Sequence, residues 1–193
     1  MLENIDLEKL KIDKEFFQRC DTFTSLLQKW GKVHNLSGRL TKEDIEENII
    51  DSVSPLEFIE NFESLADIGT GAGYPGLILA MARAEKNVYL IEPRQKRVAF
   101  LNFVKNSLGL KNVEVLCKRV EEVSDLKVDL ITSRAVTNTK LLLDITKNIS
   151  TENTSFLFYK GSLLDSEIEE AKLKDCIIKN RKDRNYLYLK GNL

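Results

Sequence analysis

Histidine and cysteine are scarce in this sequence of 193 residues. It has one histidine, His34, and three cysteines, Cys20, Cys117 and Cys176, which lie far apart and form no CxxC pair. A zinc centre or a Ser-His-Asp triad needs more of these side chains than the chain supplies. The scattered, odd-numbered cysteines also argue against a disulfide framework and fit a reducing compartment. We therefore expect a cytoplasmic protein without a metal site.

Long hydrophobic runs and an excess of one charge sign are also missing. No apolar stretch is long enough to span a bilayer, and the first residues lack the basic and apolar parts of a secretory signal. The chain carries 29 Lys and Arg against 30 Asp and Glu, so its net charge gives no support for non-specific nucleic-acid binding. The balanced net charge does not exclude a local basic patch. The length predicts one structural unit with no membrane partner, and we favour a monomer.

Helical spacing gives way to alternating strands and helices along the chain. Apolar residues at three- and four-residue steps predict a helix over 13–33, and Thr41 with Asp44 predicts the start of a second helix. Pro55 predicts the first turn of a short third helix. Strands are expected at 65–68, 88–91, 113–116, 128–131, 155–159, 176–178 and 186–189, and helices at 75–81, 98–108, 138–148 and 165–174.

This order predicts an α/β fold of the Rossmann-like class. The sheet should be mostly parallel and seven-stranded, with helices on both faces and an antiparallel last strand. We expect residues 1–60 to form a helical N-terminal extension that packs on a core domain over 61–193.

Four of the nine glycines fall within residues 69–76, directly after an apolar strand that carries Asp67 near its end. A strand that turns sharply into a helix can bring backbone N–H groups close to a ligand only where side chains are absent. A single tight turn does not require three glycines at alternate positions, as Gly69, Gly71 and Gly73 are. We therefore expect these three glycines to bind a ligand, with the Asp67 carboxylate beside it.

Glu92 ends the next predicted strand, 21 residues after Gly71. An acid at that place can accept hydrogen bonds from both hydroxyls of a ribose. Together, the glycine loop and Glu92 predict a site for an adenosine-type ligand.

Two ligands fit this pattern, because the segment from Gly71 to Gly76 also satisfies the GxGxxG dinucleotide fingerprint. Three observations favour S-adenosylmethionine over a nicotinamide. Asp67 would repel a pyrophosphate but suits the ammonium and sulfonium of a methyl donor. Pro75 removes an N–H that a pyrophosphate would use. Little chain remains for a hydride-transfer domain. A nicotinamide-dependent oxidoreductase stays the less favoured alternative.

Arg134 follows the fourth predicted strand in Ser133-Arg134-Ala135. The turn lacks the Asp/Asn-Pro-Pro-Tyr expected for methylation of an exocyclic amine, and it has no cysteine for covalent attack on a pyrimidine. An arginine there suits a nucleophile that carries no proton, such as guanine N7 with O6 beside it. The main task of the enzyme is then to position the nucleophile against the methyl group, and no general base is expected. Arg134 could instead hold a phosphate or the donor carboxylate, or form a structural ion pair.

The sequence resembles the RsmG (GidB) family, bacterial methyltransferases of guanine N7 in small-subunit ribosomal RNA. The resemblance covers about residues 23–161. It includes Lys29-Trp30-Gly31-Lys32-Val33-His34-Asn35-Leu36, Ile50-Asp51-Ser52, the loop over 67–76, Lys96-Arg97-Val98-Ala99-Phe100-Leu101, Arg119-Val120-Glu121-Glu122, Ser133-Arg134-Ala135 and Lys160-Gly161. The loop with its Pro-Gly ending and the Ser-Arg-Ala turn are specific together.

The resemblance implies S-adenosylmethionine as cofactor and 16S rRNA or the small ribosomal subunit as partner. Methylation of a small molecule or of a protein stays a second alternative. By this resemblance Gly69 and Tyr74 line the donor site, Val120 and Glu121 flank the adenine, and Arg134 reaches the donor or the target base. Asn35, Asp51, Arg119 and Lys160 are expected on the RNA side of the cleft.

Asn48 departs from the family pattern, which often has His-x-x-Asp-Ser where this chain has Asn48-Ile49-Ile50-Asp51-Ser52. Asparagine can donate and accept hydrogen bonds but carries no charge. A protonated-histidine role is therefore not expected here.

Overall fold

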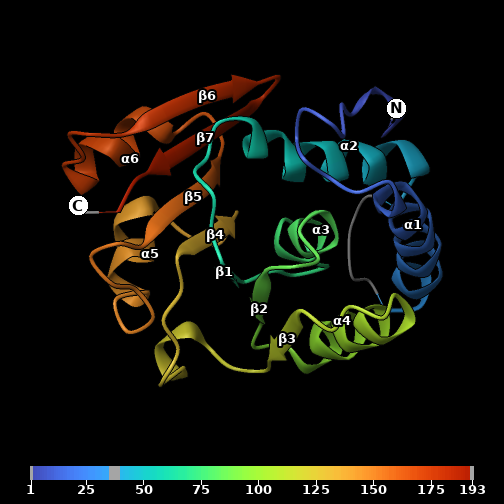
Figure 1. Ribbon diagram of the computed structural model, residues 1–193. Coiled ribbons are helices and arrows are strands. Elements are labelled where there is room, and N and C mark those ends of the chain that lie inside the picture. The colour runs from blue at the N-terminus through green and yellow to red at the C-terminus, as the bar shows by residue number, and fades with distance from the viewer. Residues whose placement is uncertain (1, 35–39, 192–193) are drawn as a thin grey trace.

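The computed structural model describes residues 2–34 and 40–191. Within them the chain forms one seven-stranded sheet with helices on both faces (Figure 1). The strand order is β3-β2-β1-β4-β5-β7-β6. The strands are β1 (Ser64–Ile68), β2 (Asn87–Ile91), β3 (Val113–Leu116), β4 (Leu130–Arg134), β5 (Ser155–Lys160), β6 (Ile177–Arg181) and β7 (Arg184–Leu189). The predicted α/β architecture is confirmed.

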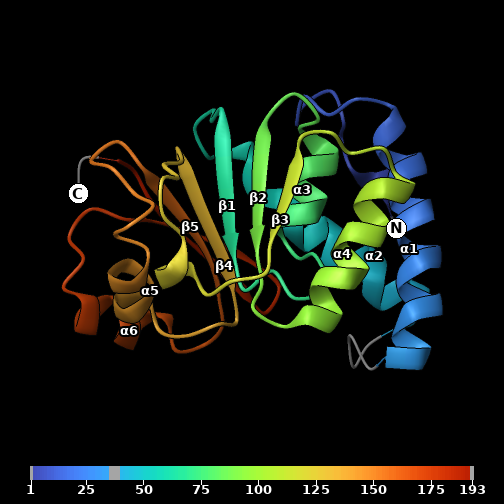
Figure 2. The same cartoon turned by 90° about the horizontal axis from the view of Figure 1, so that it is seen from below.

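Strands β1 to β5 pair in parallel, whereas β7 runs antiparallel to both β5 and β6. The predicted closing hairpin therefore lies at the sheet edge, with β7 on its inner side. Because the parallel strands share one direction, their carboxyl ends meet at one edge of the sheet, as Figure 2 shows for β1 to β4. Open α/β sheets bind their ligands at that edge.

The fourth strand begins two residues later than the predicted 128–131 and extends to Arg134. Asp129 precedes it, and its Oδ2 accepts hydrogen bonds from the backbone N–H groups of Glu63 and Ser64 at 3.0 and 2.9 Å. This contact ties the starts of β1 and β4 together. Arg134 is therefore the last residue of the strand rather than part of the turn that follows it.

The N-terminal extension packs on one face of the sheet together with two helices of the core. These four helices are α1 (Glu15–His34), α2 (Lys42–Val53), α3 (Gly76–Ala82) and α4 (Gln95–Ser107), and short 3-10 turns lie at η1 (Leu2–Asn4) and η2 (Ser54–Glu57). The predicted start of α2 is confirmed, because the Thr41 hydroxyl accepts the Asp44 N–H at 3.1 Å. Side chains of α1 and α2 share one buried core with β1, β2 and β7.

A second buried core lies on the opposite face, under α5 (Thr139–Ile145), α6 (Leu164–Ala171) and the 3-10 turn η3 (Val120–Glu122). No helix in the described ranges is both long and apolar enough to cross a membrane. The sheet therefore lies between two buried cores, one on each face. Side chains at the carboxyl ends of its strands pack against one core or the other.

Candidate functional site

The glycine loop joins β1 to α3 at the carboxyl edge of the sheet. Its backbone has positive φ angles of +65° at Gly69, +61° at Gly71 and +104° at Gly73, where side chains are disfavoured. A Cβ atom at Gly71 would lie in ordinary van der Waals contact, 3.8 Å from Arg97 Nη1. At Gly73 it would lie 2.9 Å from Leu77. Gly71 therefore lies against Arg97 and Gly73 packs against Leu77 of α3, and ligand binding by either glycine stays a prediction.

Asp67 lies beneath this loop, where it is fully buried. Its Oδ2 accepts the Gly76 N–H at 2.9 Å and its Oδ1 accepts the Thr132 hydroxyl at 2.8 Å. Burial raises the pKa of the Asp67 carboxyl to about 6, against the opposing effect of its hydrogen bonds. The expectation that this carboxylate lies beside a bound ligand is corrected: Asp67 ties the loop and the start of α3 to β4.

Glu92 follows β2 and points under the glycine loop, with only 2% of its surface exposed. Its Oε2 accepts the Gly71 N–H at 3.1 Å and an Arg97 N–H at 3.3 Å, and its Oε1 accepts the Arg94 N–H at 2.9 Å. A carboxylate offers about four lone-pair positions, so Glu92 keeps accepting capacity for a ligand. The predicted partnership of Glu92 with the loop is therefore present in the structure.

A cavity of about 410 Å³, which we call the donor cavity, opens beside Glu92. It brings together five of the predicted site residues, namely Gly69, Glu92, Arg119, Val120 and Glu121. Its apolar lining comes from Ile68, Ile91, Ile145 and Val136. The lining combines these apolar side chains with the carboxylates of Glu92 and Glu121, so it offers both a flat-ring surface and hydrogen-bond acceptors, as a nucleoside site does.

Val120 reaches the donor cavity from η3, and a side chain of the next layer fixes it there. Asn148 donates to the backbone oxygens of Val120 and Val123 at 2.7 and 2.8 Å. Sequence reasoning missed this contact, because an asparagine 28 residues away carries no local signal for it.

Four basic side chains, Arg94, Arg97, Lys118 and Arg119, line the same cavity. Arg94 and Arg97 lie at the start of α4, after β2, and Lys118 and Arg119 follow β3; the parallel sheet brings both segments to the same edge. The two basic groups thus border one cavity mouth, as an anionic partner would require. A polyanion bound there would lose affinity as salt rises.

Arg134 lies on the opposite face of the sheet from η3 and does not line the donor cavity. Its Nη1 donates to Asn48 Oδ1 at 2.7 Å and to Asp51 Oδ2 at 3.2 Å, both on α2. The guanidinium carbon lies 4.8 Å from the centre of the Tyr74 ring, a distance typical of cation–π contact. The structure thus gives Arg134 an ion pair with Asp51.

Tyr74 lies in the glycine loop but faces α1 rather than the donor cavity. Its ring packs edge-on against Phe23, with the centroids 5.6 Å apart. The buried hydroxyl has no hydrogen-bond partner within residues 2–34 and 40–191, and burial raises its pKa. Tyr74 does not line the cavity beside Glu92, and its part in binding the donor stays a prediction.

Asp51 is 5% exposed and is the centre of this second group of residues. Besides Arg134, it accepts Arg184 Nε at 3.2 Å on Oδ2 and the Tyr186 hydroxyl at 2.9 Å on Oδ1. We call Arg134, Asn48, Asp51, Tyr74, Arg184 and Tyr186 the Arg134 cluster. Asp51 was expected to face RNA; the structure instead buries it between α2, β4 and β7.

Three comparisons with known proteins bear on this arrangement. The family model for rRNA small subunit methyltransferase G (GidB) matches residues 17–192. A ribosomal RNA small subunit methyltransferase G from Aliarcobacter butzleri is 65% identical over 97% of this chain and 96% of its own length. A protein of the same name from Wolinella succinogenes is 44% identical over 94% of this chain and 93% of its own length. This chain belongs to the GidB family.

Solved structures place the GidB fold among methyltransferases. A methyltransferase from Geobacter sulfurreducens matches with a TM-score of 0.63 at 14% identity, over 88% of each chain. A ribosomal protein L11 methylase from Lactobacillus delbrueckii subsp. bulgaricus matches with a TM-score of 0.57, also at 14% identity, over 81% of each chain. These likenesses show the fold alone. Family membership sets aside both the nicotinamide oxidoreductase and a methyltransferase of small molecules or proteins.

Lys160 ends β5 and was expected on the RNA side of this GidB protein. Only 6% of its surface is exposed. Its Nζ donates to Glu167 Oε2 at 2.6 Å and to the Thr137 carbonyl at 3.1 Å, while Glu167 also accepts the Thr139 N–H at 2.7 Å. The expectation is corrected: Lys160 fixes the segment after β4, which includes Val136 of the donor cavity.

Two further residues complete the comparison with the family pattern. Asn48 stands where the family often has histidine, and it accepts a hydrogen bond from Arg134 while donating one to the Asp44 carbonyl at 2.7 Å. A neutral amide is sufficient for both contacts. Asn35, predicted on the RNA side, lies outside the described residues.

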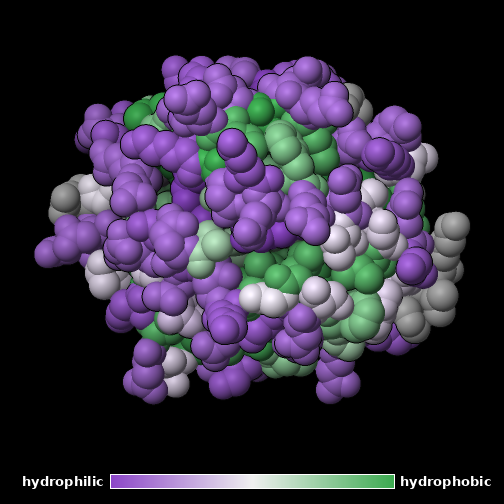
Figure 3. Space-filling view, turned by 45° about the vertical axis from the view of Figure 1, so that its right-hand side comes forward, coloured by the Kyte–Doolittle hydropathy of each residue, from purple (hydrophilic) through white to green (hydrophobic). Residues whose placement is uncertain are grey.

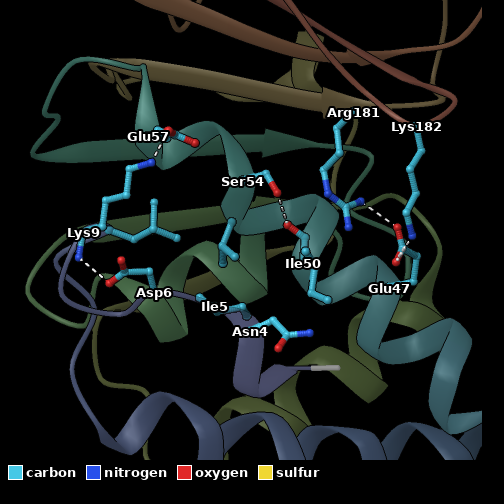
Figure 4. A pocket seen from close by; sticks show the side chains of 12 residues that line it. Asn4, Ile5, Asp6, Lys9, Glu47, Ile50, Ser54, Glu57, Arg181 and Lys182 are labelled. Atoms are coloured by element: carbon cyan, nitrogen blue, oxygen red, sulfur yellow. Dashed lines mark hydrogen bonds and ion pairs between the residues drawn. The ribbon is translucent and has the colours of Figure 1, made fainter.

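A second cavity, of about 400 Å³, lies between the N-terminal segment, α2 and the hairpin of β6 and β7 (Figure 4). Glu47 crosses its rim and accepts hydrogen bonds from Arg181 at 2.6 Å and Lys182 at 2.8 Å. These two cations lower the pKa of Glu47 to about 2. None of the predicted site residues lines this cavity, so its contacts serve to hold the hairpin against α2.

Proposed function

We propose that this chain transfers a methyl group from S-adenosylmethionine to N7 of a guanine in small-subunit ribosomal RNA. The observation that carries the proposal is the placing of Glu92, Val120 and Glu121 around one cavity beside Gly69. Membership of the GidB family supports ribosomal RNA as the substrate class.

S-adenosylmethionine supplies an electrophilic methyl group on a positively charged sulfur. The residues present fit this donor. Glu92 keeps about one lone-pair position for a ribose hydroxyl, and accepting the second hydroxyl would require it to give up a present donor such as Arg97 at 3.3 Å. Hydrogen bonds to a charged group contribute about 1.5–3 kcal/mol each. Gly69 lines the donor cavity, and its lack of a side chain suits close approach of a ligand to the backbone.

Val120 and Glu121 suit the adenine end of the donor. Val120 is buried and held by Asn148, so its backbone is fixed before a ligand arrives. Ile91 and Ile145 offer apolar surface to a flat ring within the same cavity. The basic residues Arg94, Arg97, Lys118 and Arg119 at its mouth suit the phosphates of the RNA.

Guanine N7 attacks with a lone pair and loses no proton, so a general base is unnecessary. Alignment of the two reacting groups can then lower the barrier by roughly 7–11 kcal/mol. Arg134 suits the base edge, because only its Nη1 is bonded among the described residues. Its Nε and Nη2 groups can donate to O6 and N7 acceptors, as arginine does in base recognition. Contact through N7 would have to be released for attack, so O6 is the productive partner.

The test uses small ribosomal subunits, and separately their naked RNA, from cells that lack the gene. Purified protein and methyl-labelled donor are added, and the digested nucleosides are identified by mass. We expect 7-methylguanosine at a single position in at least one of the two substrates. Label on any other atom, or in neither substrate, would contradict the proposal. The two arms also show whether naked RNA or the assembled subunit is methylated.

A further inference from the structure

An exposed aromatic side chain interrupts the polar surface of α4. Phe103 is 40% exposed, and its ring centre lies 5.3 Å from that of Trp30 on α1, with 31° between the planes. Trp30 in turn lies 5.8 Å from the buried ring of Phe100. Phe103 is thus the outer member of an aromatic stack that is anchored in the core. The face with α1 and α4 is turned forward in Figure 3, where hydrophobic surface emerges between polar side chains.

The segment around this stack is strongly basic in a chain of net charge −1. Residues 93–113 contain no aspartate or glutamate and five basic residues, namely Arg94, Lys96, Arg97, Lys105 and Lys111. On α4 itself, Lys96, Ala99 and Phe103 are all exposed and follow at steps of three and four, so they lie on one face. Cationic and aromatic groups on one surface are the combination that binds single-stranded nucleic acid.

The basic face continues directly into the donor cavity. Arg94 and Arg97 at the start of α4 line that cavity, and Lys96 lies between them in the sequence. From Lys96 to Phe103 the helix rises by about 10 Å. A strand that places a guanine at the cavity can therefore continue along α4 towards Phe103.

We propose that the Lys96–Ala99–Phe103 face of α4 binds single-stranded RNA, with one base next to the target region stacked on Phe103. This inference rests on the proposed function and names a second contact for the same substrate. Trp30 supports the Phe103 ring from behind, and the basic residues contact phosphates. Stacking of a base on an aromatic ring contributes about 1–3 kcal/mol. A second copy of the chain is a poorer occupant, because two such faces would bring like charges together.

The experiment exploits the fact that Trp30 is the only tryptophan. A single-stranded oligoribonucleotide is added to the full-length protein while tryptophan fluorescence is followed, and methyl transfer is measured on the small-subunit substrate. We expect RNA to quench Trp30 in the wild type. Phe103→Ala and Phe103→Leu should raise KM for RNA about fivefold to a hundredfold. Phe103→Tyr should restore it, because only a ring offers a face for stacking.

Ile178→Ala is the matched control, since Ile178 is 39% exposed but lies on β6 at the far end of the sheet order. It should keep the wild-type KM and the quenching. A KM for RNA within twofold of the wild type in Phe103→Ala, or no quenching of Trp30 by RNA in the wild type, would overturn the inference. So would fluorescence that changes with protein concentration alone, which would indicate a second copy as occupant. Methyl transfer at the wild-type rate without quenching refutes this surface only; no transfer by any variant refutes the proposed function instead.

Discussion

The donor cavity and the Arg134 cluster lie at neighbouring strand ends but are built in different ways. The donor cavity depends on backbone conformation and on Glu92, whose side chain accepts hydrogen bonds from residues at most 21 positions away. In the Arg134 cluster, Asp51 contacts Arg134, Arg184 and Tyr186 across 83 to 135 positions. Residues 68–145 supply the whole lining of the first, whereas the second joins α2, β4 and β7 from both ends of the chain.

The difference separates two tasks. Under the proposed function, the donor cavity would hold a ligand common to all methyltransferases that use this donor, which a short local motif can recognise. The Arg134 cluster would face the nucleotide; it holds its arginine with Asn48 and Asp51 of α2, and Arg184 of β7 binds the same Asp51. Changes in the extension or the hairpin should therefore affect the target side more than donor binding. Four substitutions test this division.

Arg134→Ala should have the largest effect. We expect kcat to fall about 10²–10³-fold, the usual result of removing one fixed donor from an active site. Stability should fall less, because Arg184 and Tyr186 still neutralise and bind Asp51. Turnover on the small-subunit substrate and urea unfolding measure the two quantities. Arg184→Ala is the control: if both variants lose turnover and stability in equal proportion, Arg134 serves only as an ion pair.

Lys160→Ala should lower the free energy of unfolding by about 3 kcal/mol, because it leaves Glu167 without its cation in a poorly solvated place. Urea unfolding measures this loss. The salt dependence of RNA affinity should stay as in the wild type. Arg119→Ala provides the contrast, with little loss of stability and a salt slope reduced by about one. A stable Lys160→Ala protein with a reduced salt slope would return Lys160 to the RNA side.

Glu92→Ala should weaken binding of S-adenosylhomocysteine by at least about tenfold, the equivalent of one hydrogen bond to a charged group. Calorimetry measures the dissociation constant. Glu92→Gln keeps the shape of the side chain without its charge. Its dissociation constant should lie between those of the wild type and Glu92→Ala. An unchanged constant in Glu92→Ala would remove this residue from the donor cavity. Arg134→Ala should leave donor affinity nearly unchanged, if the two sites are separate as described.

Glu47→Gln should have the smallest effect, about 0.5–1 kcal/mol at neutral pH, since the ion pairs with Arg181 and Lys182 are partly solvated. Because the folded-state pKa is lowered to about 2, the wild-type carboxylate stabilises the fold above pH 4.5. This contribution is lost as pH falls towards 2. Unfolding curves of both proteins should therefore converge in acid. A constant difference down to pH 2 would show that the ion pairs do not stabilise the hairpin.

Sequence reasoning succeeded where a residue's role follows from its neighbours along the chain. The alternation of strands and helices and the cap at Thr41 are of this kind. It failed for Asp67 and Lys160, whose type and position suggested contact with ligand or RNA. Both are buried, because Thr132 and Glu167 from other elements bind them. A sequence motif does not show which face of a strand end meets a packed layer.

Arg184, Tyr186 and Asn148 went unrecognised for the same reason. Each acts through one contact with a residue far away in the sequence, at Asp51 or Val120. The sequence by itself determined the sheet, the glycine loop and the acid one strand over, because backbone preference and hydrophobic periodicity are local. Only the tertiary structure decided which charged groups are buried as partners and which face the solvent, because burial and pairing depend on the layers that meet at each strand end.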